Sequence, residues 1–187
     1  MKRLVIKTSL ITLASFIGAL VITFSALCLF APATLAGFFD DVGSYSASVF
    51  FYEKQCDMSG DIKDLEKLFV KVNENKDYAN IEKFAKKIIE HKDFKNYSIE
   101  DKEYYYGYYA LSLAKNGKFD NAIDSGKAFV EKYTYTEFNP LRVLITDYIK
   151  EDMVEEKEKL RTAIIETNNV EVLQNIFKVT DLATLLS

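Results

Sequence analysis

The sequence predicts an all-α protein with one N-terminal transmembrane helix followed by a small helical domain. Residues 8–39 carry no charge, and the basic residues Lys2, Arg3 and Lys7 precede them. Beyond Asp41, apolar residues recur at intervals of three and four, the spacing that places them on one face of a helix. The alternating pattern of a β-strand is hardly visible, so the domain is expected to be helical throughout.

The uncharged run has the length and composition of a membrane span. About 20 apolar residues cross a bilayer as a helix, and basic residues beside a first span favour the cytoplasmic side. The first charges after the run are Asp40 and Asp41. We therefore expect residues 1–7 in the cytoplasm, residues 8–36 in the lipid bilayer as a signal-anchor, and residues 40–187 outside the cytoplasm.

A cleavable signal sequence is the alternative reading of the same run. Residues 31–33 and 34–36 both present small side chains at the spacing that a signal peptidase reads, and Pro32 would break the helix just before them. A signal sequence usually has an apolar stretch of about 7–15 residues, so the length of this one favours a retained anchor. Either fate leaves the domain outside the cytoplasm, on the membrane or secreted.

The composition of the outer domain excludes several classes of function. Residues 40–187 contain 21 basic and 28 acidic side chains, a net charge of −7, which disfavours nucleic acid as a partner. Cys56 is the only cysteine beyond the span, so no internal disulfide is expected. The abundance of Lys, Asn, Ile and Tyr is typical of a bacterium with an AT-rich genome.

Capping residues mark where the predicted helices begin. Asp61, Asp77 and Ser98 each precede an apolar stripe with helical spacing, and the helix after Ser98 runs to Lys115. A polar stretch at 91–97 separates the second helix from the third. The apolar stripes of the first two helices are Ile62, Leu65, Phe69 and Val72, and then Ile81, Phe84, Ala85, Ile88 and Ile89.

The C-terminal half continues the helical pattern. Gly117 supplies the left-handed residue that commonly ends a helix, and Asn139-Pro140 is a favourable helix start. The intervening helix buries Phe119, Ala122, Ile123, Gly126, Phe129 and Val130. Two or three further helices follow, with apolar faces at Leu141, Leu144, Ile145, Tyr148 and Ile149; at Leu160, Ile164 and Ile165; and at Val172, Leu173, Ile176, Phe177, Leu182, Leu185 and Leu186.

Three turn-plus-helix starts resemble one another, at residues 43–49, 76–81 and 117–123. Their aromatic residues Tyr45 and Tyr78 are 33 residues apart, close to the period of one helical repeat architecture. The third unit, residues 104–133, resembles a tetratricopeptide repeat. The matching positions are Tyr106, Tyr109, Ala110 and Leu113 in its first helix, Gly117 and Phe119 in the turn, and Ala122 in its second helix.

The resemblance covers residues 43–133, with departures at Phe129, where the family prefers alanine, and at Thr134, where it prefers proline. It implies a small right-handed stack of antiparallel helical hairpins, a tetratricopeptide-like array that binds protein partners. No catalytic residue is carried over by the resemblance.

The residues that commonly carry catalysis or bind metals are few. His91 is the only histidine and lies in a charged stretch, so we expect a solvated loop residue rather than a metal ligand. Ser112 and Lys115 have the Ser-x-x-Lys spacing of penicillin-recognising enzymes, but the companion motifs of that family are absent. We expect no catalytic residue, no metal and no cofactor, and hence no enzyme.

Five tyrosines crowd one segment of the third predicted helix. Tyr106 and Tyr109 share the core stripe with Ala110, and tyrosine offers a large rigid contact surface with a polar tip. A second stripe of side chains lies on another face of the same predicted helix. It would line the concave face of a hairpin array, or it would instead pack on an N-terminal helix around residues 50–52. This candidate partner-binding stripe consists of Tyr104, Tyr108, Leu111 and Lys115.

The expected function is that of a membrane-anchored, extracytoplasmic helical-repeat module that binds a protein or peptide partner at the cell envelope. One alternative is a permanent structural subunit of a membrane complex, assisted by the small residues Ala14 and Gly18 of the span. Another is a secreted helical protein, released when the signal is cleaved.

Overall fold

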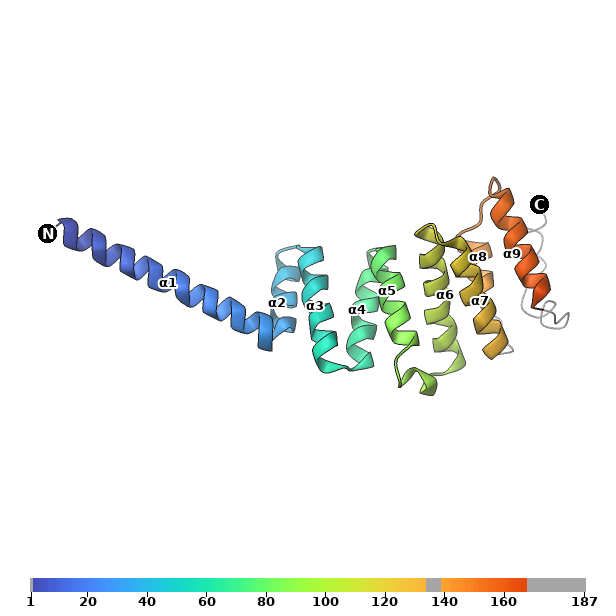
Figure 1. The fold of residues 1–187 in the computed structure, drawn as a ribbon, viewed down its shortest axis with the longest axis horizontal. Coiled ribbons are helices and arrows are strands. Elements are labelled where there is room, and N and C mark those ends of the chain that lie inside the picture. The colour runs from blue at the N-terminus through green and yellow to red at the C-terminus, as the bar shows by residue number, and fades with distance from the viewer. Residues whose placement is uncertain (1, 134–138, 168–187) are drawn as a thin grey trace. The chain divides into compact units, whose positions relative to one another are not determined.

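The computed structural model describes residues 2–133 and 139–167 (Figure 1). Across these residues all regular structure is helical, with nine α-helices and one short 3-10 helix, which confirms the predicted all-α class. The chain divides into two compact units, residues 1–64 and 65–187, and each is described by itself. The helix predicted around 172–186 lies outside the described residues.

The first unit begins with the long apolar helix that the sequence predicts. Helix α1 (Lys2–Phe30) contains a segment, Ile11–Phe30, of 20 residues that is long and apolar enough to cross a membrane or to serve as a signal sequence. The large apolar side chains described along this segment are mostly exposed. Exposed apolar surface of this extent along a helix is typical of a membrane span or a signal sequence.

Pro32 separates α1 from a second helix instead of opening an extended segment. Its ring occupies the first turn of α2 (Pro32–Asp41), where the missing N–H costs no hydrogen bond. The predicted cleavage region at 31–36 is therefore largely helical, and Ala36 is fully buried. Gly43, with φ +73°, turns the chain from α2 into α3 (Tyr45–Ser59).

The second unit contains the remaining helices. Helix α4 begins at the end of the first unit and continues into the second. The elements are α4 (Ile62–Glu74), α5 (Tyr78–Ile89), the 3-10 helix η1 (Phe94–Asn96), α6 (Ile99–Lys115), α7 (Phe119–Lys132), α8 (Pro140–Asp147) and α9 (Val154–Glu166). Helix α6 is central to this unit, since it packs against α5, α7 and α8.

The predicted helix starts are confirmed by their capping hydrogen bonds. The Asp77 carboxylate accepts from the backbone N–H of Asn80 at 3.2 Å. The Ser98 hydroxyl accepts from the N–H of Asp101 at 3.1 Å, and Asn139 Oδ1 accepts from the N–H of Arg142 at 3.1 Å. These bonds satisfy donors that a helix N-terminus otherwise leaves unpaired.

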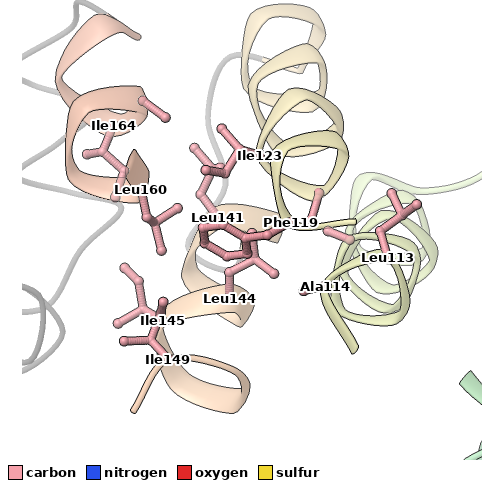
Figure 2. Close-up of a cluster of buried hydrophobic side chains, with 13 residues drawn as sticks. Leu113, Ala114, Phe119, Ile123, Leu141, Leu144, Ile145, Ile149, Leu160 and Ile164 are labelled. Atoms are coloured by element: carbon pink, nitrogen blue, oxygen red, sulfur yellow. The ribbon is translucent and has the colours of Figure 1, made fainter. Parts of the chain in front are cut away.

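A buried cluster joins α6, α7, α8 and α9 into one core (Figure 2). Gly117, with φ +77°, ends α6 and lets α7 fold back beside it. The core consists of Ala110, Leu113, Ala114, Phe119, Ala122, Ile123, Leu141, Leu144, Ile145, Ile149, Leu160, Ala163 and Ile164. This core fixes α8 against α6, the arrangement on which the candidate site depends.

Candidate functional site

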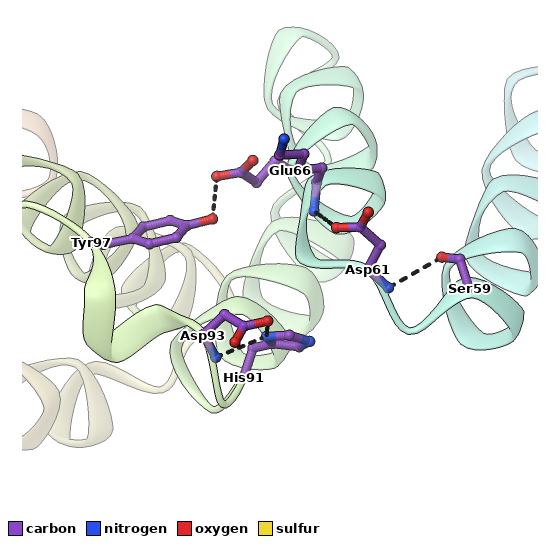
Figure 3. A network of polar contacts seen from close by, with 7 residues as sticks. Ser59, Asp61, Glu66, His91, Asp93 and Tyr97 are labelled. Atoms are coloured by element: carbon purple, nitrogen blue, oxygen red, sulfur yellow. Dashed lines mark hydrogen bonds and ion pairs between the residues drawn. The ribbon is translucent and has the colours of Figure 1, made fainter.

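Tyr105 is the most deeply buried of the five tyrosines on α6. Its ring lies edge-on to Phe69 of α4 at 5.1 Å, and its hydroxyl donates to Glu66 Oε1 at 3.2 Å. The hydroxyl of Tyr97 donates to the same oxygen at 2.5 Å (Figure 3). The sequence predicts Tyr106 and Tyr109 as core residues, yet both are only half-buried.

Burial and the shared carboxylate both raise the pKa of the two phenols. Burial, followed by the hydrogen bond and negative charge of Glu66, raises the pKa of Tyr97 above its ordinary value. Burial and the charge of Glu66 likewise raise the pKa of Tyr105. The two tyrosines and Glu66 thus tie α4 to α6 and to the segment that precedes α6.

The neighbouring face of α6 forms one wall of a groove of about 320 Å³, and α8 forms the other. Eight residues line it: Glu100, Glu103, Tyr104, Gly107, Tyr108 and Leu111 from α6, and Val143 and Asp147 from α8. We call this the α6–α8 groove.

Tyr104 and Tyr108 provide the aromatic wall of the groove. Their rings are 4.9 Å apart, and each contacts Phe69 edge-on, at 5.9 Å and 5.8 Å. Tyr104 still exposes 44% of its surface. Burial and the adjacent Tyr108 raise the pKa of Tyr104, while a hydrogen bond with Asn73 lowers it by less. The net shift is upward, so the phenol is neutral at physiological pH. The wall is therefore a supported aromatic surface that solvent can reach.

Gly107 allows α6 and α8 to approach at the groove. A Cβ atom at this position would lie 3.2 Å from Val143 Cγ2, closer than an ordinary van der Waals contact. The missing side chain thus brings Val143 into the groove lining and leaves space beside the two tyrosines.

The lining carries carboxylates and no basic side chain. Glu100 and Asp147 are exposed, and Glu103 is 9% exposed. Among the residues that the structure describes, neither Glu100 nor Asp147 takes part in an ion pair. The groove therefore combines a partly apolar, aromatic surface with a negatively charged rim.

The structure brings together three residues of the predicted stripe. Tyr104, Tyr108 and Leu111 all line the groove, and Leu111 is the least exposed of them at 8%. Lys115 does not line it, because its ammonium lies 5.5 Å from the ring centroid of Tyr148 and 6.0 Å from that of Tyr78.

The sequence analysis missed the contributions of α8. Val143 and Asp147 lie more than thirty residues beyond Tyr104, and no local pattern signals that they face it. Gly107 offered a weak signal, since a glycine inside a helix is costly unless another element approaches closely there.

A second groove, of about 390 Å³, lies between α7 and α9. Both of its lysines form ion pairs: Lys127 Nζ lies 2.8 Å from Glu166 Oε2, and Lys159 Nζ lies 3.1 Å from Asp120 Oδ1. Five carboxylates and two lysines line this second groove, and it has no aromatic wall, which distinguishes it from the α6–α8 groove.

The side chains considered for chemistry have local structural contacts. His91 Nδ1 accepts a hydrogen bond from the N–H of Asp93 at 3.2 Å (Figure 3). The His91 side chain is only 15% exposed, so it is less solvated than the sequence predicts. The Ser112 hydroxyl is buried and donates to the Tyr109 carbonyl at 2.8 Å. No group of metal-ligating side chains occurs in the described part of the chain.

Comparison with known proteins assigns the chain to no family. The resemblance of residues 104–133 to a tetratricopeptide repeat therefore stays a prediction. The chain matches no family model, no curated protein and no solved structure.

Proposed function

We propose that the protein is a membrane-anchored, extracytoplasmic helical module that binds a protein or peptide partner through the α6–α8 groove. The observation that carries this proposal is the aromatic wall of Tyr104 and Tyr108, held from behind by Phe69 and open to solvent. Aromatic side chains that are rigid before binding lose little entropy on contact and often dominate the energy of an interface.

The charge of the groove specifies the chemistry of the partner. A lysine or arginine side chain can lie on the face of Tyr104 while its charge meets Glu100 and Asp147. The net charge of −7 over residues 40–187 also attracts a basic partner at longer range. We therefore propose a partner segment in which a basic residue stands beside an apolar one.

The proposed architecture is a short array of helical hairpins. Tight turns at 75–77 and 116–118 join α4 to α5 and α6 to α7, with Lys76 and Gly117 both at positive φ. Within the α6–α7 pair, Tyr106 packs on Phe129 at 5.1 Å. These features support a tetratricopeptide-like arrangement, in which the groove would belong to the partner-binding face.

The proposed topology places residues 1–7 in the cytoplasm and retains α1 as the anchor. The end of α1 supports this, because Leu27 and Cys28 pack on the small core of Leu35, Ala36 and Phe51. Removal of residues 1–36 would take away part of that core. The anchor then acts by holding the groove close to partners at the membrane.

Partner capture by groove variants tests the proposal. The full-length chain is expressed in its membrane, crosslinked in intact cells and purified, and the bound proteins are compared between variants. Tyr104→Ala should weaken capture at least about tenfold, the loss typical of a hot-spot aromatic residue. Glu100→Lys should weaken it as well, because it reverses the charge at the rim. Val154→Ala, at an exposed position of α9, is the matched control and should capture normally.

Three results would contradict parts of the proposal. Unchanged capture by Tyr104→Ala, in a chain with unchanged circular dichroism, rules out the groove as the binding site. Normal capture by Glu100→Lys contradicts the proposal that the partner is basic, and leaves the groove as the binding site. Capture by α1 without the domain would favour the alternative, a structural subunit assembled through its membrane helix.

A further inference from the structure

The outer end of α1 packs against the first helices of the domain. Phe24 of α1 lies edge-on to Phe51 of α3, with ring centroids 6.5 Å apart and planes at 89°. Leu27 and Cys28, one turn further on, pack on the same core. The helix pair α2–α3 therefore contacts the last two turns of α1.

This contact sets the depth of the α2–α3 pair when α1 spans a bilayer. The apolar segment ends at Phe30. At about 1.5 Å of rise per residue, Phe24 lies roughly 9 Å of helix axis inside that end. Because Phe51 touches Phe24, part of α3 reaches the level of the outer headgroups or the acyl chains beneath them.

Three large apolar side chains in the α2–α3 region are exposed. Phe38, Val42 and Phe50 have 56%, 58% and 60% of their surfaces exposed. Ring contacts join Phe38 to Phe39 at 5.4 Å, Phe39 to Phe51 at 5.4 Å and Phe50 to Phe51 at 5.1 Å. The exposed rings thus continue from the core that contacts α1.

The charge pattern suits the same environment. Residues 42–52 carry no charge, although charged residues flank them on both sides. Tyr45 and Tyr52 lie within this stretch, and tyrosine is enriched where a membrane protein crosses the headgroup region. Asp40 and Asp41, which are exposed, stand between Phe38 and Val42 in the chain. The surface therefore combines aromatic side chains suited to lipid with charges suited to the headgroup region.

We propose that the α2–α3 pair lies in the headgroup region of the outer leaflet, with Phe38, Val42 and Phe50 inserted among the lipids. This rests on the proposed retention of α1 as an anchor. The partner is the bilayer itself, and the chain contacts it through the interfacial pair as well as through the span.

Single-tryptophan variants test the inference, since the chain contains no tryptophan. Phe38→Trp and Phe50→Trp are each made in the full-length chain and reconstituted into phosphatidylcholine vesicles with or without brominated acyl chains. Val154→Trp, on exposed α9, is the matched control. Phe38→Trp and Phe50→Trp should emit at shorter wavelength than the control and lose intensity in brominated vesicles, while the control keeps its intensity.

The outcomes separate the inference from the anchor on which it rests. A chain that does not float with vesicles overturns the anchor and therefore the proposed function. A chain that floats, but whose tryptophans at 38 and 50 are unaffected by bromine, overturns the interfacial position alone. Equal quenching at 38, 50 and 154 also overturns it, because the contact is then not specific to the α2–α3 pair. The three substituted side chains are exposed and lie on α2, α3 and α9, and circular dichroism checks that each variant folds.

Discussion

At the scale of single residues, the carboxylate of Glu66 organises the aromatic region behind the groove. It accepts hydrogen bonds from the hydroxyls of Tyr97 and Tyr105, two residues that the chain brings together from either side of Ser98. Phe69, one turn further along α4, then supports the rings of Tyr104 and Tyr108. The proposed binding surface thus depends on the residues that support it from behind.

Tyr97→Phe should destabilise the second unit by about 1–3 kcal/mol, the usual effect of losing a hydrogen bond to a charged group. The variant removes the 2.5 Å bond to Glu66 and keeps the ring. Urea unfolding of the full-length chain in mild detergent measures the change. Tyr109→Phe serves as the control, because Tyr109 makes no hydroxyl contact with Glu66. Equal stability of Tyr97→Phe and the parent chain would contradict this role of Glu66.

The protein should lose stability in alkaline solution. Burial raises the pKa of Tyr97, Tyr104, Tyr105 and Tyr106 in the folded state above the ordinary value of 10.0. Below pH 10 the phenols are protonated in the folded and unfolded states, so their contribution is fully present. Above it the unfolded state releases protons first, and the contribution falls as the pH rises through the raised values.

Urea unfolding between about pH 9 and pH 11.5 measures this loss. Ion-paired lysines such as Lys127 and Lys159, whose pKa values are raised by their carboxylate partners, shift stability in the same direction. The double variant Tyr97→Phe, Tyr105→Phe isolates the tyrosines and should show a shallower decline. An identical decline in both proteins would contradict a tyrosine origin.

At the scale of helices, close approach is achieved where glycine faces another element. Gly126 of α7 lies against Leu141 of α8, and a Cβ atom there would come within 2.8 Å of Leu141 Cγ and 3.4 Å of its backbone nitrogen. Leu141 is 1% exposed, so it has little space into which to move. At Gly107 of α6 the corresponding obstacle is a single methyl group of half-buried Val143, at 3.2 Å.

Gly126→Ala should therefore be less stable than Gly107→Ala, by about 1–3 kcal/mol, the usual cost of overpacking a core. Both substitutions add the same helix propensity in a helix interior, so that gain cancels in the comparison. Thermal or urea unfolding of the two variants gives the difference. A Gly126→Ala chain as stable as Gly107→Ala would show that α7 and α8 are not held this closely.

The helices were predictable where their signals are local. Asp77, Ser98 and Asn139 bond to backbone N–H groups three residues ahead, and such caps can be read directly from the sequence. The groove was predictable only on its α6 side. Its α8 side depends on packing between residues distant in the sequence, and the separation of Lys115 from the stripe depends on the positions of two distant tyrosine rings.

At the scale of the whole molecule, the proposed function depends on keeping the helical domain at the membrane. Most of the predicted cleavage region, residues 31–36, lies within helix α2. The end of α1 packs on the core around Phe51. Both features favour a chain that keeps its span.

Intact mass measurement of the protein purified from membranes should therefore give the 21.4 kDa chain, apart from processing of Met1. The chain should also resist extraction by carbonate, as an integral membrane protein does. The control replaces Ala33 and Thr34, two exposed residues, by large residues, which removes the small side chains from both predicted cleavage sites, and this variant should keep residues 1–36. A parent chain that lacks residues 1–33 or 1–36, when the blocked variant keeps them, would show that the span is a cleaved signal.

Site-specific photocrosslinking in intact cells tests the central claim most directly. A benzophenone amino acid replaces Tyr104 in the α6–α8 groove or, in a separate chain, Val154 on α9. The account predicts a discrete adduct from position 104 with a protein accessible outside the cytoplasm, at a basic segment of that protein, and a much weaker adduct from position 154. Equal labelling from the two positions, or no adduct from position 104 in a correctly folded and inserted chain, would contradict a binding module built around this groove.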